Sequence, residues 1–159
     1  MKTISPKARM WFFTASRFLT KDECESAVAH MRAFLAQWTS HGNSMVASCD
    51  LILKRILWVA VDETGAQASG CGIDALTREV QAIGQSFNLD FFDRQAVVFQ
   101  RPDAEPESMR LHEFWAHCKA GNITDDVLVV DTTVKTFDLC SDEMLMPWRK
   151  TWHGEMWNS

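Results

Sequence analysis

The chain has 159 residues, a formal net charge of −5 and 47% hydrophobic residues, a composition typical of a folded globular core. The acidic balance argues against a nucleic-acid partner, because the only short basic pairs are Lys54-Arg55 and Arg149-Lys150. No apolar run approaches the roughly 20 residues of a membrane span. Five cysteines without a CxxC pair indicate reduced thiols. We therefore expect a cytoplasmic protein without membrane contact.

The first elements of the chain follow from periodicity. Residues 10–14 predict an aromatic-rich strand, and a capping box from Thr20 to Glu23 predicts the start of a helix. Gly42 is its expected stop. The apolar side chains of this helix recur at spacings of three and four residues: Cys24, Ala27, Val28, Met31, Phe34, Leu35 and Trp38.

Two strands and a second helix are expected next. Residues 45–53 and 56–61 predict a hairpin with its tip at Lys54-Arg55, and the second strand is apolar enough for a central position. Residues 73–87 predict a helix with Asp74 as N-cap. Residues 96–100 predict a fourth strand. The order strand, helix, strand, strand, helix, strand is that of an α+β, ferredoxin-like βαββαβ sandwich with an antiparallel sheet.

The remainder of the chain predicts an extension of this core. A polar loop with two prolines spans 101–108, residues 111–118 predict a short helix closed by Gly121, and residues 127–130 predict a strand. The tail from 144 to 157 is rich in Met and Trp, so we expect it to pack against the body. The expected organisation is a single domain, 1–159, with its core in 10–100 and its C-terminal extension in 101–159.

The loop DETGAQASGCGID, residues 62–74, has the glycine spacing of a phosphate-binding loop between a strand and a helix. A Walker A loop would continue with Lys and then Ser or Thr after Gly70, but Cys71 and Gly72 stand there. The segment 57–63 imitates a Walker B strand on the wrong side of the loop. ATP binding or hydrolysis is therefore the third hypothesis. Amides near a helix start, at Ser69 and Gly70, could still bind an anion, whereas a solvated glycine turn is the simpler interpretation.

Cys71 is the candidate nucleophile of this loop. Its small neighbours would leave the sulfur accessible, and a helix start favours the thiolate, although Asp74 opposes it. His41 or His153 could act as the base if the fold brings either close, with Asp62, Asp74 or Asp93 orienting the ring. The alternative is that Cys71 is a small apolar residue, as free cysteines usually are.

Other polar residues are weaker candidates for a ligand site. Asp93, Arg94 and Trp152 could contact a ligand, although a turn with solvated charges is the favoured explanation of Asp93 and Arg94, and core packing that of Trp152. His112 and His117 are five residues apart and do not share a helical face, so we expect no metal site and no cofactor.

Several short motifs occur in the same order as in a known family: Trp38-x-x-His41-Gly42, Val61-Asp62-Glu63, Ser69-Gly70-Cys71-x-Ile73-Asp74, Phe92-Asp93-Arg94 and Trp152-His153. With them the chain resembles a small, uncharacterised bacterial family, mainly from Bacteroidetes, some members of which are labelled "ABC transporter ATPase". The resemblance implies a bacterial cytosolic protein and brings no mechanism.

The sequence supports two classes of function. The first is a non-catalytic binding or interaction domain, with a small molecule, another protein or a second copy of the chain in a homodimer as its partner. The second is a small thiol or acid–base enzyme that uses Cys71 with His41 or His153. The absence of any complete catalytic motif favours the first.

Overall fold

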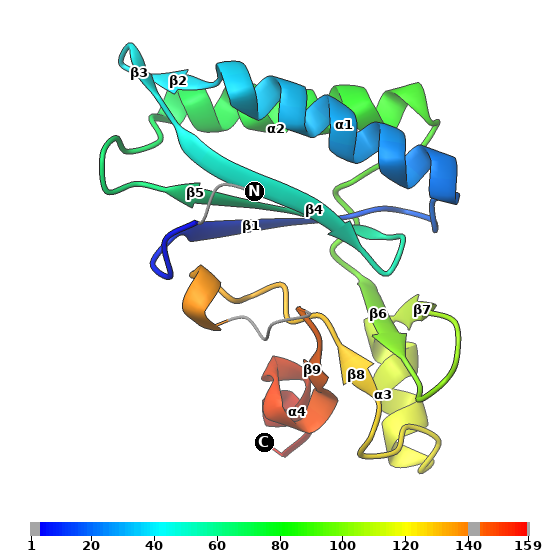
Figure 1. Ribbon diagram of the computed structural model, residues 1–159. Helices are drawn as coiled ribbons and strands as arrows, with labels where there is room; N and C mark the ends of the chain where they lie inside the picture. The colour runs from blue at the N-terminus through cyan, green and yellow to red at the C-terminus, as the bar shows by residue number, and fades with distance from the viewer. Residues whose placement is uncertain (1–3, 140–143, 159) are drawn as a thin grey trace. The chain divides into compact units, whose positions relative to one another are not determined.

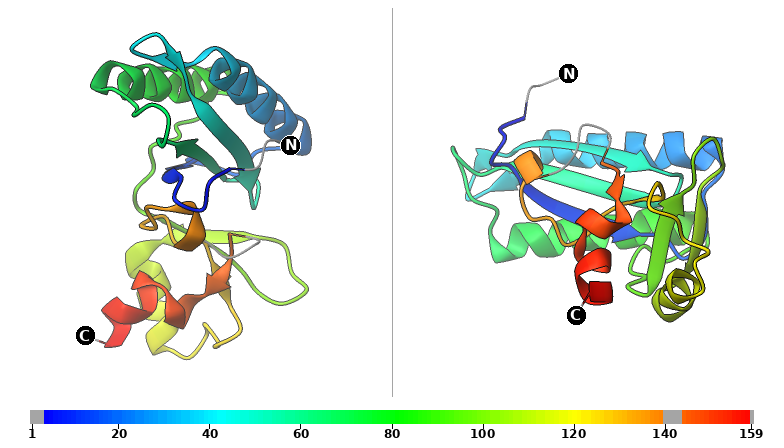
Figure 2. Two further views of the ribbon diagram at one scale, coloured as in Figure 1. Left: turned by 60° about the vertical axis from the view of Figure 1, so that its left-hand side comes forward. Right: turned by 90° about the horizontal axis from the view of Figure 1, so that it is seen from below.

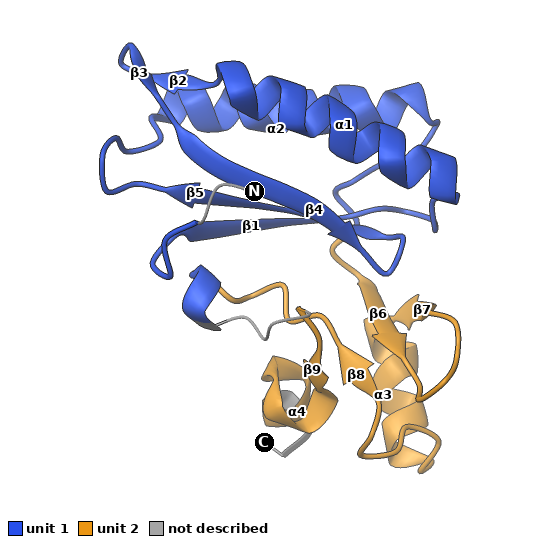
Figure 3. Ribbon diagram, viewed as in Figure 1, with its two compact units in different colours: residues 1–93, 135–139 blue, residues 94–134, 140–159 orange. Residues whose placement is uncertain are grey.

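The computed structural model describes residues 4–139 and 144–158. The chain forms two compact units, shown in Figure 3: unit 1 comprises residues 1–93 and 135–139, and unit 2 comprises residues 94–134 and 140–159. Helices are combined with antiparallel sheets, which confirms the α+β class. Within the described ranges, no helix has the length and apolar character needed to cross a bilayer. That the two units act as a single domain stays a prediction.

Unit 1 contains a three-stranded antiparallel sheet in the order β1-β5-β4, and Figure 1 shows both long helices on one face of it. The predicted first strand, hairpin and central apolar strand are confirmed. The elements of the unit are β1 (Arg9–Thr14), α1 (Lys21–Gln37), β2 (Thr39–Ser40), β3 (Asn43–Ser44), β4 (Val46–Ile52), β5 (Ile56–Asp62) and α2 (Gly70–Ser86).

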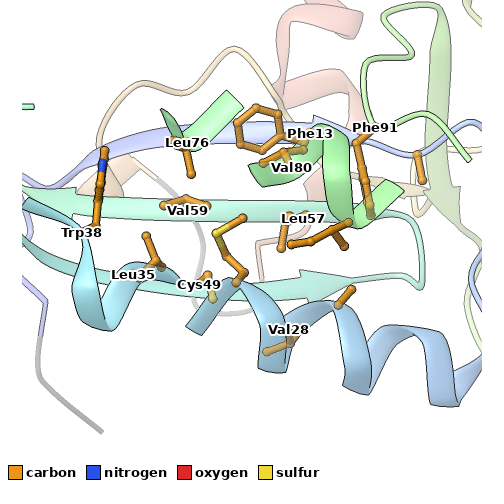
Figure 4. Packing of buried hydrophobic residues seen from close by; sticks show 14 of the residues in the cluster. Phe13, Val28, Leu35, Trp38, Cys49, Leu57, Val59, Leu76, Val80 and Phe91 are labelled. Atoms are coloured by element: carbon orange, nitrogen blue, oxygen red, sulfur yellow. The ribbon is translucent and has the colours of Figure 1, made fainter. Parts of the chain in front are cut away.

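The core of unit 1 lies between the sheet and the two helices. Figure 4 shows Leu35 and Trp38 at the end of α1, Val59 on β5, and Leu76 and Val80 on α2, all facing the same interior. The capping box is confirmed, because the Thr20 side chain accepts from the Glu23 amide and the Glu23 carboxylate accepts from the Thr20 amide. The predicted apolar stripe of α1 is the face that packs on the sheet, since its residues belong to the core of unit 1.

Two predicted helix boundaries are wrong. Helix α1 ends at Gln37, because Trp38 leaves the helix with extended backbone, and Gly42 turns the β2-β3 hairpin with φ +81° instead of stopping the helix. Helix α2 begins at Gly70, and its N-cap is Ser69; Asp74 lies inside the helix. The glycines of the 62–74 loop therefore belong partly to the first turn of α2.

Unit 2 contains a four-stranded antiparallel sheet in the order β7-β6-β8-β9. Its core gathers around Phe114 and Trp148, which are 0% and 1% exposed, so the packing of the tail is confirmed at Trp148. The side chains of Met156 and Trp157 lie outside the described residues. The elements are β6 (Ala96–Gln100), β7 (Glu107–Arg110), α3 (Leu111–Lys119), β8 (Leu128–Val129), β9 (Met146–Pro147), the short helix η2 (Trp148–Lys150) and α4 (Trp152–Asn158).

The predicted ferredoxin-like sheet is not confirmed. Residues 96–100 do form a strand, β6, but this strand pairs with β7 and β8 in unit 2 and does not join the sheet of unit 1. Part of the predicted loop supplies its partner, β7, and the predicted strand at 127–130 is the short β8. A short 3-10 helix, η1 (Phe137–Leu139), returns to unit 1, where the Phe137 ring packs near Trp58.

Candidate functional site

The β2-β3 hairpin and the loop before α2 meet at one end of the helical layer of unit 1, as Figures 1 and 2 show. The Ser40 side chain, only 3% exposed, joins them: its Oγ donates to the Gln67 carbonyl at 2.5 Å and accepts from the Ser69 amide at 3.1 Å. A Glu63 carboxylate oxygen accepts from the Ala68 amide at 3.0 Å. Side-chain hydrogen bonds therefore fix a loop that has no regular secondary structure.

Trp38 fixes the start of α2 from the other side. Its indole Nε1 donates to the Gly72 carbonyl at 3.1 Å, and the Ser69 Oγ accepts from the Gly72 amide at 3.0 Å. A Cβ atom added at Gly72 would lie 3.2 Å from the Ser69 Oγ and 3.4 Å from the Trp38 Nε1. Gly72 is therefore explained by packing against Trp38.

A shallow pocket of about 200 Å³ opens beside these contacts. Two of the site residues predicted from sequence, His41 and Ser69, contribute to its wall. His41 has φ +51°, a left-handed conformation that holds the tight hairpin turn. The pocket is lined by Ser40, His41, Asn43, Ala66, Gln67, Ala68 and Ser69.

Cys71 is exposed in the first turn of α2, next to the pocket in sequence but not part of its wall. The other described cysteines, Cys24, Cys49 and Cys118, are buried or half-buried, and burial raises the pKa of each of their thiols. Among the residues that the structure describes, no hydrogen bond joins Cys71 to a histidine. Gly70 and Asp74 are also exposed on this turn and the next.

His153 lies in the core of unit 2 and is 3% exposed. The Thr151 hydroxyl donates its only proton to the Trp148 carbonyl at 2.8 Å, so it accepts from the His153 Nδ1 at 2.9 Å. The neutral ring therefore carries its proton on Nδ1. Burial lowers the pKa of His153 to about 4, against an opposing effect of Asp131.

Three further sequence candidates lie apart from the pocket wall. Trp152 stacks on the His153 ring with centroids 4.0 Å apart, and its buried Nε1 has no hydrogen-bond partner in residues 4–139 and 144–158. Asp93 closes unit 1, where its amide donates to the Thr14 carbonyl at 3.1 Å. Arg94 is exposed and begins unit 2.

The sequence analysis missed Ser40, Asn43 and Gln67. Each lies in a short hairpin or an irregular loop, where no periodic pattern distinguishes one polar residue from the next. In the described part of the chain, no three His, Cys, Asp or Glu side chains are grouped to hold a metal ion.

Comparison with known proteins adds no constraint to this site. No family model matches the chain, and neither a curated protein nor a solved structure shows significant similarity to it.

Proposed function

We propose that the protein is a non-catalytic binding domain and that the pocket between the β2-β3 hairpin and the 63–69 loop takes a small polar molecule. The observation that carries this proposal is the composition of the pocket wall. Five of its seven residues have polar side chains, and the other two are alanines. Convergent polar groups are what fixes the orientation of a ligand in a binding site.

The surroundings of the pocket support a preformed site. The hydrogen bonds of Ser40, Trp38 and Glu63 hold both walls, so a ligand would meet a backbone that is already ordered. Preorganisation of this kind reduces the entropy lost on binding. The volume of about 200 Å³ lies below the roughly 300–1,000 Å³ of sites for drug-sized ligands, which favours a small ligand.

The chemistry of the wall favours a ligand with both hydrogen-bond donors and acceptors. Asn43 and Gln67 are exposed amides that can donate and accept, and His41 can do the same as a neutral imidazole. Because no Asp, Glu, Lys or Arg contributes to the wall, hydroxyl- or amide-bearing compounds fit better than strongly charged ones.

The proposal can be tested by NMR titration of ¹⁵N-labelled protein with polyols, small amides, carboxylates and amines at millimolar concentration. We expect a polyol or an amide to shift the backbone signals of residues 39–44 and 63–69 selectively. Gln67→Ala should weaken this binding, whereas Gln85→Ala, which removes an exposed amide from the last turn of α2, should leave it unchanged. If no compound shifts these signals, or if both variants bind equally well, the proposal is wrong.

A second candidate, a thiol enzyme, is favoured by the exposure of Cys71, two residues along the chain from Ser69, which shares a pocket wall with His41. If His41 activates the thiol, iodoacetamide should modify Cys71 at pH 7 faster than it modifies a small reference thiol. His41→Asn should slow this reaction, and Asn tolerates the positive φ of the turn. Cys71→Ser is the control for the site of modification. A rate equal to that of the reference thiol, and insensitive to His41→Asn, would exclude this candidate.

A further inference from the structure

Strand β4 is an edge strand of the unit 1 sheet, because among the described strands it pairs with β5 alone. The register of the sheet shows which backbone groups of β4 point outward, that is, away from β5. On β1, the Met10 amide and the Thr14 carbonyl bond away from the sheet, so Trp11 bonds to its partner Val59. Since Val59 bonds toward β1, its other partner, Cys49, directs its amide and carbonyl away from β5.

The outward backbone groups of β4 therefore belong to Ala47, Cys49 and Leu51. The Leu51 amide is bonded to the Asp50 carboxylate at 2.8 Å, and the remaining groups have no partner among the described residues. Val46, on the same strand, is 40% exposed, an unusual degree of exposure for a large apolar side chain. An edge of this kind is a template for another strand.

We propose that a second copy of the chain occupies this edge, with the two β4 strands antiparallel about a two-fold axis at Cys49. The two three-stranded sheets would become one continuous sheet, and the carbonyl of Ala47 from the other copy would replace Asp50 as the acceptor for the Leu51 amide. This register pairs Val46 with Ile52, Ala47 with Leu51, Ser48 with Asp50, and Cys49 with its own copy.

The side chains select this register from its neighbours. It matches apolar with apolar residues and lets the Ser48 hydroxyl donate to the Asp50 carboxylate of the other copy. Residues whose backbone groups point away from β5 must face each other across the new pair of strands, so the alternative registers are shifted by two residues. One alternative places Asp50 opposite Asp50, where the like charges repel, and the other places Val46 opposite Asp50. A second copy of β4 is therefore a complementary partner in one register only.

Arg32 gives the proposed dimer a distinctive response to salt. The cationic side chain of this exposed α1 residue lies near the Cys49 thiol, where it opposes the effect of burial on the thiol pKa, so the two copies of Arg32 would flank the two-fold axis. Their repulsion would be screened as the ionic strength rises. The dimer should therefore tighten with added salt, and Arg32→Gln should tighten it further at low salt.

Disulfide trapping in a Cys71→Ser background tests the register. Ser48 and Asp50 would form non-hydrogen-bonded pairs, in which Cα atoms are about 4.5 Å apart, within the usual range for a disulfide. A mixture of a tagged S48C chain and an untagged D50C chain should give a mixed disulfide in a glutathione redox buffer. Neither variant alone should give a dimer above the background of the Cys71→Ser chain. A D50C–D50C or S48C–S48C dimer in place of the mixed product would overturn the register.

Sedimentation equilibrium of the full chain tests the dimer itself. Val46→Lys should raise the dimer dissociation constant about tenfold, because Lys replaces both Val46–Ile52 pairs. Ala82→Lys, which adds the same charge at an exposed position of α2, should leave it unchanged. A chain that remains monomeric at millimolar concentration and high salt, or a dimer equally sensitive to both variants, would overturn the proposal.

Discussion

Acidification should destabilise unit 2 through a single buried residue, His153. The ring is 3% exposed, and burial lowers its pKa from 6.5 to about 4. Between these two pH values the unfolded chain binds a proton that the folded chain does not bind, so stability rises with pH in this window. The stability contributed by neutral His153 is complete above about pH 6.5 and is lost progressively as the pH falls toward 4.

The size of this effect follows from the difference between the two pKa values. Each pKa unit corresponds to about 1.4 kcal/mol, so the full loss is about 3 kcal/mol, of which about 2 kcal/mol should be lost between pH 7.5 and pH 5. Glu23 makes stability depend on pH in a different pH range, because its hydrogen bond with Arg17 lowers its pKa from 4.5 to about 2. Its stabilising effect is present above pH 4.5 and is lost only at more acidic pH.

The assay is amide hydrogen exchange in unit 2, resolved by NMR and repeated from pH 7.5 to pH 4.5, with an NMR titration of the His153 ring. His153→Phe should remove most of the pH dependence in this range, and His112→Asn, a change at an exposed histidine, should keep it. A ring that titrates near 6.5 in the folded protein would refute the argument from burial. So would a pH dependence that persists in His153→Phe.

Three further predictions concern the start of α2. Gly72→Ala should destabilise unit 1 by about 1–3 kcal/mol, because the added Cβ atom would crowd Trp38 and Ser69. Gly70→Ala should be neutral or stabilising by up to about 1 kcal/mol, because nothing lies within 4 Å of a Cβ atom there. Thermal unfolding of both variants would show the opposite order of stability if the packing argument fails. Ser40→Ala should lower the free energy of unfolding by about 1–3 kcal/mol, since it leaves the Ser69 amide without its acceptor. An unchanged midpoint of denaturant unfolding would contradict this. Mg-ATP at millimolar concentration should leave the NMR signals of residues 62–74 unchanged, because Cys71 and Gly72 replace the Walker lysine and hydroxyl; selective shifts there would restore the ATP hypothesis.

The elements that could be predicted from sequence are those whose signals are local. The capping box and apolar spacing of α1 lie within one segment, and the uniform apolar character of β5 requires burial on both faces. The position of β6 depends on partners distant in sequence. One of them, β7, has four residues that are half-buried or exposed and follows two prolines, so it looks like part of a loop. Another, β8, has only two residues, which is too short for any period to show.

The start of α2 shows why the site was harder to predict than the fold. Asp74 has a good N-cap side chain, and the glycines at 70 and 72 look like breakers before it. The competing N-cap, Ser69, prevails because Trp38 packs where a side chain at position 72 would lie and bonds to the Gly72 carbonyl. That contact joins residues 34 positions apart, and the same fold places Ser40 against Gln67. The pocket wall is thus created by a long-range contact, and its polar residues acquire a common role only after the end of α1 has docked on the start of α2.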